Sequence, residues 1–325
     1  MTETTISATA PETGKRRFSI QDFARQYGVL LIIILLMIGL AFLSPSFLTA
    51  RNLLNIVNQS VPLALIAAAL TLVIISGGFD LSTGAIFGVA GVSAAWLAVN
   101  VDPTLGMIAG PLIGIVLGII NGLIITGFNV HSFLATLATS MVYRGIAVLI
   151  TGGALIPVRM PEFAWLGRER IGMVNVAVIV LVIFTAAMMI LLNRTTFGRR
   201  VIAVGGNEEA AILSGVRTNL IKIAAFSLTG FAAGLAGVIA VSRISMGQPQ
   251  AGVGIELEAI AAVILGGTSI YGGAGAVWRS IAGVMLLALI GNGFNILNVN
   301  PFYKDLTTGA IIVAAVALSA GKRRR

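Results

Sequence analysis

The stretch YGVLLIIILLMIGLAFL (Tyr27–Leu43) contains no charged residue and no proline. A helix that crosses a membrane needs about 20 mostly apolar residues, whereas a helix of a soluble protein keeps one polar face. The stretch begins late in the chain, and Pro45 and Phe47 after it make a poor signal-peptide cleavage site. It therefore predicts an uncleaved membrane span.

Similar apolar runs continue to the end of the chain. They cover residues 61–76, 83–99, 105–126, 133–150, 174–192, 223–241, 257–267, 279–298 and 307–319. Of the 325 residues, 57% are hydrophobic and only 10% are charged, against about 25% charged in a soluble domain. This composition excludes an ordinary soluble enzyme. We expect an all-α polytopic membrane protein with about ten transmembrane helices, some of them short or broken.

Basic residues predict the orientation and the division of the chain. They gather in a disordered tail (1–24), in a polar loop (194–222) and in a basic C-terminal tail (321–325), around a membrane domain of residues 25–320. Basic segments next to spans stay in the cytoplasm, so both termini and the loop are predicted to be cytoplasmic. The apolar runs between these segments are even in number, which agrees with a shared side.

Other basic residues do not fit this orientation. Arg159, Arg168 and Arg170 fall in the 151–173 loop, which the topology places outside. The net charge of +9 is explained by basic residues beside the membrane spans, where they fix orientation and contact lipid, and does not indicate binding of nucleic acid.

The chain lacks the residues that most enzymes and metal sites need. It has no cysteine and one histidine, His131, so no thiolate or histidine-based metal site and no catalytic residue is predicted. No Gly-x-x-x-x-Gly-Lys-Ser/Thr motif occurs, so ATP hydrolysis is not expected of this chain.

Charged residues are scarce inside the runs. Arg144 lies deepest, and the others fall at or near run ends: Asp80, Arg243, Glu256, Glu258, Arg279 and Asp305. Ion-coupled carriers usually place a titratable group within the membrane, so the scarcity counts against such a carrier.

Two similar glycine strings flank the runs 83–99 and 257–267. IISGGFDLSTGA (Ile74–Ala85) contains Gly77, Gly78 and Asp80, and VILGGTSIYGGA (Val263–Ala274) contains Gly266 and Gly267. Glycines beside short spans mark broken helices that line a transport path, or else close helix packing. Asp80 fits an N-cap of the following helix, a gating role, or both.

Neutral polar residues within or beside the runs are further candidates for the path. They could hydrogen-bond a hydroxylated solute or bridge neighbouring helices. The group consists of Asn121, Thr136, Thr139, Ser140, Asn292 and Asn295.

The loop 194–222 predicts a short helix. Asn207 is a good N-cap, Glu208 and Glu209 suit the positive end of the helix dipole, and Gly215 is a natural stop. This helix would present Ile212, Leu213 and Val216 beside a basic rim. It is either a plain surface helix or a docking surface for a cytoplasmic partner.

The string Glu209-Ala210-Ala211-x-x-x-Gly215 resembles the EAA-type coupling loop of bacterial ATP-binding-cassette importer permeases. The chain is most similar to the ribose-type permeases of the carbohydrate uptake transporter 2 class. Six segments match that class in order: Ser44–Ile56, Ser76–Ala85, Phe133–Gly145, Gly198–Val216, Gln248–Gly273 and Gly291–Leu297.

The resemblance implies a permease subunit of an importer in a bacterial inner membrane. Two permease subunits, as a homodimer or heterodimer, would form the pore, and a periplasmic binding protein would deliver a monosaccharide. A cytoplasmic ATPase would bind ATP and Mg²⁺, so this chain itself needs no cofactor. The ATPase would dock at Asn207, Glu208, Glu209, Ala210, Ala211 and Gly215.

The resemblance has departures and leaves alternatives open. Phe79, Thr83, Tyr271 and Ala274 stand where ribose-type members often carry other residues. The sugar is therefore left as a ribose-like pentose or a hexose. The alternatives are an importer permease for nucleosides or branched-chain amino acids, and an ion-coupled secondary carrier.

Overall fold

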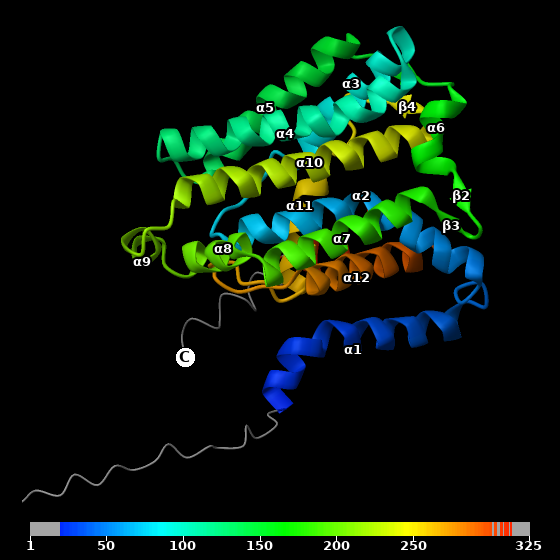
Figure 1. Cartoon of the computed structure of the whole chain (residues 1–325). Coiled ribbons are helices and arrows are strands. Elements are labelled where there is room, and N and C mark those ends of the chain that lie inside the picture. Colours follow the sequence, from blue (N-terminus) through cyan, green and yellow to red (C-terminus); the bar gives the residue numbers. More distant parts are fainter. Residues whose placement is uncertain (1–19, 301, 304–305, 308, 312, 314–325) are drawn as a thin grey trace, which may run out of the picture.

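The computed structural model describes residues 20–300, 302–303, 306–307, 309–311 and 313. Long helices run side by side through most of the described chain, which confirms the predicted all-α polytopic class (Figure 1). In chain order they are α1 (Ile20–Leu43), α2 (Ala50–Ile75), α3 (Thr83–Asn100), α4 (Pro103–Gly127), α5 (Ser132–Thr151), α6 (Pro161–Arg168), α7 (Val176–Arg194), α8 (Thr196–Gly206), α9 (Glu208–Leu213), α10 (Thr218–Ile244), α11 (Ile255–Leu265) and α12 (Val277–Ile296).

Local sequence signals set the ends of several helices. The side chain of Asp102 accepts the N–H of Leu105 at 2.9 Å, and Pro103 occupies the first position of α4. In the same way, Asn175 accepts the N–H of Ala177 at 2.8 Å and starts α7. Helix α5 ends at Gly152, whose φ of 60° is the left-handed conformation that glycine adopts without strain.

The described residues contain fewer helices with the length and composition of a membrane span than the predicted ten, and most of the tenth run, 307–319, lies outside them. Within the described residues, seven are long and apolar enough: α2, α3, α4, α5, α7, α10 and α12. The apolar part of α1, Tyr27–Leu43, is shorter. Helix α11 has 11 residues, about 16 Å of helix, and is too short to cross a hydrocarbon core of about 30 Å.

The predicted tails fall largely outside the described residues. Helix α1 already begins at Ile20, inside the range 1–24 that the sequence assigns to the first tail. Residues 1–19 and the basic tail 321–325 lie outside the described residues, as does most of the run 307–319.

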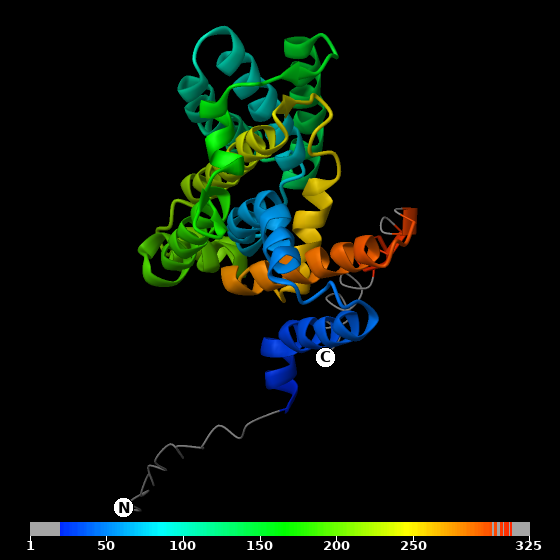
Figure 2. The ribbon, with the colours of Figure 1, turned by 90° about the vertical axis from the view of Figure 1, so that its right-hand side faces the viewer.

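Helix α2 lies at the centre of the bundle (Figure 2). Almost every residue from Ser60 to Ile75 is buried, against α7, α10, α11 and α12. Helix α1 lies to one side and packs on α12 (Figures 1 and 2). Tyr27 meets Trp278 there, with 6.3 Å between ring centroids. Burial on all sides explains why the part of α2 from Val61 to Ile75 is apolar on nearly every face.

Helices α4 and α10 lie side by side and approach each other through glycine (Figure 1). A Cβ atom on Gly114 would overlap the carbonyl oxygen of Gly230, and one on Gly230 would overlap that of Gly114. The close face of α4 repeats every fourth residue, at Gly106, Gly110, Gly114, Gly118 and Gly122. Rows of small residues let membrane helices pack backbone to backbone.

Four short strands lie at the end of the bundle opposite α9 (Figure 1). β1 (Ile156–Pro157) pairs antiparallel with β4 (Met246–Gly247), and β2 (Arg170–Ile171) pairs antiparallel with β3 (Val174–Asn175). They close the loops before and after α6 and after α10. The bundle thus has an α9 end and a strand end.

Candidate coupling loop and solute path

The predicted short helix of the 194–222 loop is confirmed as α9. The Asn207 side chain accepts the N–H of Ala210 at 2.9 Å, so Asn207 is the N-cap. At the other end, Gly215 has a φ of 79° and its N–H donates to the Ile212 carbonyl at 2.9 Å. The Val216 N–H donates to the Ala211 carbonyl at 3.0 Å, which completes a Schellman motif.

Helix α9 presents an apolar surface beside basic residues. The side chain of Leu213 is 89% exposed and that of Ile212 is 55% exposed, while Ala211 is buried. Val216, predicted to share this surface, is half-buried and packs on the core instead. The exposed arginines of the loop are Arg194, Arg199, Arg200 and Arg217.

An ion pair ties α9 to the long helix that follows. Lys222 of α10 lies 2.6 Å from Glu208, and both side chains are partly exposed. Glu209 is exposed. The pair is therefore a direct contact between α9 and the first turns of α10.

Helix α8 joins the loop to the centre of the bundle, a contact that sequence reasoning missed. Gly205 lies so close to the end of α2 that a Cβ atom would overlap the Ile75 carbonyl oxygen and lie 2.7 Å from the Gly273 nitrogen. A Cβ atom on Gly272 would lie 3.1 Å from the nitrogen of Gly77. The signal for this contact was in the sequence, because the glycine pair Gly205–Gly206 sits just before α9.

The two similar glycine strings are two helix ends of the same type. At the end of α2, the N–H of Gly77 donates to Ile74 and that of Gly78 to Val73, both at 3.0 Å. At the end of α11, the N–H of Gly267 donates to Ile264 at 2.8 Å.

The α11 end completes the same motif through Thr268, whose N–H donates to Val263 at 3.2 Å. Gly77 and Gly267 have φ values of 86° and 83°. Both strings are Schellman motifs, which gives a physical reason for their resemblance. Gly266 packs against the backbone of Arg279 and Ser280. A role of these glycines in lining a path stays a prediction.

Asp80 and Asn121 belong to one buried polar network. Both are fully buried, and they meet through Ser82. The Asp80 Oδ1 accepts the Ser82 N–H at 2.9 Å and the Ser82 hydroxyl at 2.6 Å, and Asn121 Nδ2 donates to the same hydroxyl at 2.7 Å. Tyr143, which sequence reasoning missed, places its hydroxyl 3.0 Å from Asn121 Oδ1.

The N-cap interpretation of Asp80 is wrong. Helix α3 starts at Thr83 with Ser82 as its N-cap residue, and no side chain caps it. Asp80 lies two residues before Ser82, and its carboxylate folds back on Ser82 in a local turn. This arrangement fixes the segment between α2 and α3 rather than the first turn of α3.

Side chains of α5 hold the same segment. The Thr136 hydroxyl accepts the Leu81 N–H at 3.0 Å, and the Ser132 hydroxyl accepts the Phe79 N–H at 3.0 Å. Thr136 thus bridges α5 and the segment between α2 and α3, in agreement with the alternative that these polar residues join neighbouring elements. Thr139 bonds only within α5, to the carbonyl of Thr136 at 3.2 Å, and Ser140 is buried on the same helix.

The deeply placed Arg144 has an acidic partner. It lies 3.6 Å from Glu256 of α11, and both side chains are mostly buried. This ion pair joins α5 to the first turn of α11, across the start of α3.

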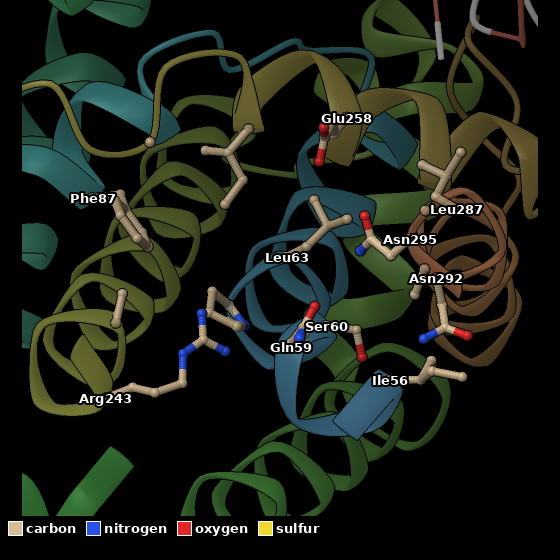
Figure 3. Close-up of a pocket in the computed structure, with 16 residues that line it drawn as sticks. Ile56, Gln59, Ser60, Leu63, Phe87, Arg243, Glu258, Leu287, Asn292 and Asn295 are labelled. Carbon is tan, nitrogen blue, oxygen red and sulfur yellow. The ribbon is translucent and has the colours of Figure 1, made fainter. Parts of the chain in front are cut away.

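Asn292 and Asn295 line a cavity of about 280 Å³ between α2, α10, α11 and α12 (Figure 3). Figure 3 shows both amides projecting from α12 toward the same space as side chains of α2. The polar lining of this cavity also includes Gln59, Ser60, Arg243 and Glu258. Asn292 and Asn295, three residues apart on α12, were the sequence signal for this cavity, because side chains at that spacing share one face of a helix.

The predicted path residues therefore fall in three separate places. Gly77, Gly78, Gly266 and Gly267 cap helices, Asp80 and Asn121 form a buried network, and Asn292 and Asn295 line the cavity. Ser82 joins Asp80 to Asn121, and one cavity joins Asn292 to Asn295. The three groups themselves do not come together.

Comparison with known proteins places the whole chain. Residues 52–316 match the family model described as branched-chain amino acid transport system / permease component. The ribose import permease protein RbsC of Bacillus subtilis (strain 168) is 40% identical over 96% of this chain and 98% of its own length. RbsC of Escherichia coli (strain K12) is 36% identical over 99% and 100% of the two chains.

A relative named for another sugar matches over a similar share of both chains. The L-arabinose transport system permease protein AraH of Escherichia coli (strain K12) is 35% identical over 98% of both chains. No solved structure matches this chain. The relatives confirm the resemblance to sugar import permeases, and the chain belongs to the family of transport permeases that the matching model describes.

Proposed function

We propose that this chain is the membrane-spanning subunit of an ATP-driven importer for a monosaccharide, a ribose-like pentose or a hexose. Full-length relatives with 35–40% identity are named for the import of ribose and arabinose, which supports this substrate class. The observation that best supports coupling to an ATPase is helix α9, which presents Leu213 and Ile212 beside exposed arginines at one end of the bundle.

The α9 end faces the cytoplasm of a bacterial inner membrane, where a cassette ATPase docks on it and binds ATP and Mg²⁺. Two permease subunits form the pore. A periplasmic sugar-binding protein docks on the strand end and carries the sugar specificity. The basic residues of the 194–222 loop support this orientation.

In the cycle, ATP binding closes the ATPase pair and moves α9. Movement of α9 reaches the bundle by two routes: the Glu208–Lys222 ion pair to α10, and Gly205 of α8 to the ends of α2 and α11. The partner supplies the free energy, and this chain supplies two packings of different stability. Hydrolysis then resets the bundle.

The experiment is co-purification in mild detergent, followed by an assay of ATP hydrolysis, with Gly215→Pro as the matched variant. Proline fixes φ near −65° and lacks an N–H, so it cannot form the left-handed stop of α9. We expect an ATPase to come down with the wild type, and the variant to insert in the membrane but to lose the ATPase or its coupling. A wild type that purifies alone and inert toward ATP contradicts the proposal.

The description of the matching family favours a second candidate, import of branched-chain amino acids. Uptake into vesicles that contain the permease, its ATPase and its binding protein separates the two. Labelled D-ribose, L-arabinose and D-allose test the first candidate, and labelled L-leucine tests the second.

A further inference from the structure

A second cavity lies next to the one lined by Asn292 and Asn295. It has a volume of about 670 Å³ and opens at the strand end, where Arg170, Gly172 and Met173 of the β2–β3 hairpin form part of its wall. Helices α2 and α12 supply residues to both cavities, which therefore follow each other along the contact between these two helices.

Two amide side chains meet where the cavities adjoin. Asn52 lines the cavity at the strand end, and Asn292 lines the deeper one. Asn52 Nδ2 donates to Asn292 Oδ1 at 3.1 Å, and Asn292 Nδ2 donates to Asn52 Oδ1 at 2.8 Å. The two hydrogen bonds close a ring between α2 and α12.

The amide pair stands in apolar surroundings. Phe47, Ile56 and Leu289 are buried in one cluster at this contact. Asn52 Nδ2 also donates to the Phe47 carbonyl at 2.9 Å, which fixes the amide of Asn52 in place. Within the described residues, both hydrogen bonds of the Asn292 side chain are with Asn52, so Asn292 is the side that can turn away.

A row of further amides continues along both helices. Asn52, Asn55 and Gln59 are spaced by three and four residues on α2, and Gln59 donates to Asn55 at 3.2 Å. Asn292 and Asn295 are three residues apart on α12. At these spacings, side chains share one face of a helix.

Amides suit a solute that carries hydroxyl groups. Each amide has N–H donors and an acceptor oxygen, and each hydroxyl can also donate and accept. A sugar can therefore replace one amide partner without leaving the other amide unpaired. One charged group that lines the deeper cavity, Arg243, already has a protein partner, because it donates to the carbonyl of Asn58 at 3.0 Å.

We propose that the Asn52–Asn292 pair is a hydrogen-bonded partition between the two cavities, and that the hydroxyl groups of a neutral sugar open it by taking the place of one amide. The sugar then moves along the amide row into the deeper cavity. The substrate class in this inference rests on the proposed function, while the partition itself does not.

The first experiment measures the partition without any sugar. The chain contains no cysteine, so Ser60→Cys places a single thiol in the deeper cavity, at a side chain that is 4% exposed. A membrane-impermeant charged methanethiosulfonate is added from the strand side of the assembled importer. With Asn52→Ala and Asn292→Ala in place, we expect the thiol to react at least tenfold faster than with the amides intact.

Asn100→Ala is the matched control, because this exposed amide bonds only to Trp96 and lines neither cavity. It should leave the rate of thiol modification unchanged. An equal rate in the alanine pair and in the control overturns the partition, provided that both complexes are recovered in the same amount.

The second experiment measures sugar uptake by the reconstituted importer. Asn52→Leu with Asn292→Leu keeps the branched shape and the number of heavy atoms and removes the hydrogen bonds, so we expect uptake of the labelled sugar to fall at least tenfold while ATP hydrolysis persists. Wild-type uptake by this pair overturns the inference. If the leucine pair does not assemble, the alanine pair decides instead: it should leak labelled sugar from loaded vesicles without ATP, and absence of a leak overturns the inference.

The two failures are distinguishable. If the wild-type importer carries none of D-ribose, L-arabinose and D-allose, the proposed function fails, and the thiol experiment still tests the partition. If the wild type carries a sugar and the leucine pair carries it equally well, only the partition fails.

Discussion

The N–H of Gly273 donates to the carbonyl of Ile75 at 2.8 Å, which joins the loop after α11 to the last residue of α2. Gly205 of α8 packs against this bond so closely that no side chain fits between them. Three segments far apart in the sequence therefore share one backbone contact, directly behind the predicted coupling helix. A movement of α8 cannot be absorbed there by side chains, because there are none.

Gly205 gives the sharpest test of this contact. In Gly205→Ala, the new Cβ atom overlaps the Ile75 carbonyl oxygen, so α8 must move away from the end of α2. We expect at least a tenfold loss of sugar uptake per ATP hydrolysed in the reconstituted importer. Gly206→Ala is the control, because its Cβ atom meets open space and should leave uptake close to wild type. Equal behaviour of the two variants would remove α8 from the coupling route.

The exposed apolar pair on α9 predicts a docking defect. Replacing Ile212 and Leu213 by serine removes apolar surface that is exposed in the isolated chain, so the melting temperature of the permease alone should change little. Co-purification of the ATPase should fall at least tenfold. Leu155→Ser changes a similarly exposed side chain at the other end of the bundle and should leave co-purification intact. Undiminished binding of ATPase by the double variant would contradict docking on α9.

The buried network around Asn121 predicts a loss of stability. In Asn121→Leu, the hydroxyls of Ser82 and Tyr143 each lose a partner in a buried site. The Ser82 hydroxyl keeps its bond to Asp80 and the Tyr143 hydroxyl keeps its bond to the Leu117 carbonyl, so the cost is that of two lost hydrogen bonds, about 1–3 kcal/mol together. Thermal unfolding in detergent should register this loss. Tyr143→Phe keeps the Asn121–Ser82 bond but takes the Tyr143 donor from the buried Asn121 Oδ1, so its cost should fall in the same range. A leucine variant as stable as the wild type would show that the network relaxes freely.

The ion pair between Arg144 and Glu256 predicts non-additive effects. Either Arg144→Gln or Glu256→Gln leaves the other charge mostly buried without its partner. Removal of one member of a fully buried pair costs about 3–5 kcal/mol. Because these side chains keep some exposure, we expect a smaller loss, about 2 kcal/mol. The double variant should be more stable than the sum of the single losses, and a double-mutant cycle by thermal unfolding measures the difference. Additive losses would mean that the two charges do not interact.

The sequence predicted elements better than it predicted contacts. Asn207 and Gly215 bound α9 as expected, because capping depends on residues within a few positions of each other. The same local logic explains the apolar helices. Three of the ten predicted runs are not among the seven long helices: the apolar part of α1 is shorter, α11 ends after 11 residues at its capping glycines, and most of the run 307–319 lies outside the described residues.

What the sequence could not predict depends on residues far apart in the chain. Asp80 fitted an N-cap by position, but its carboxylate bonds Ser82, whose hydroxyl is also bonded by Asn121 from α4. The Asn52–Asn292 pair joins residues 240 positions apart, which no local pattern reports. Apolar runs mark the segments that cross a membrane, but the partners within it are chosen by close fit and hydrogen bonding.

The glycine row of α4 also bears on how the chain is made. Helix α4 ends at Gly127, whereas the helix that covers Gly110, Gly114, Gly118 and Gly122 begins only at Thr218. During co-translational insertion, α4 thus enters the bilayer with a bare backbone stripe toward lipid and waits while α5 to α9 are synthesised. A nascent chain that stops before Thr218 keeps this stripe uncovered. Completion of α10 is the step that closes the stripe and separates a finished permease from an unfinished one.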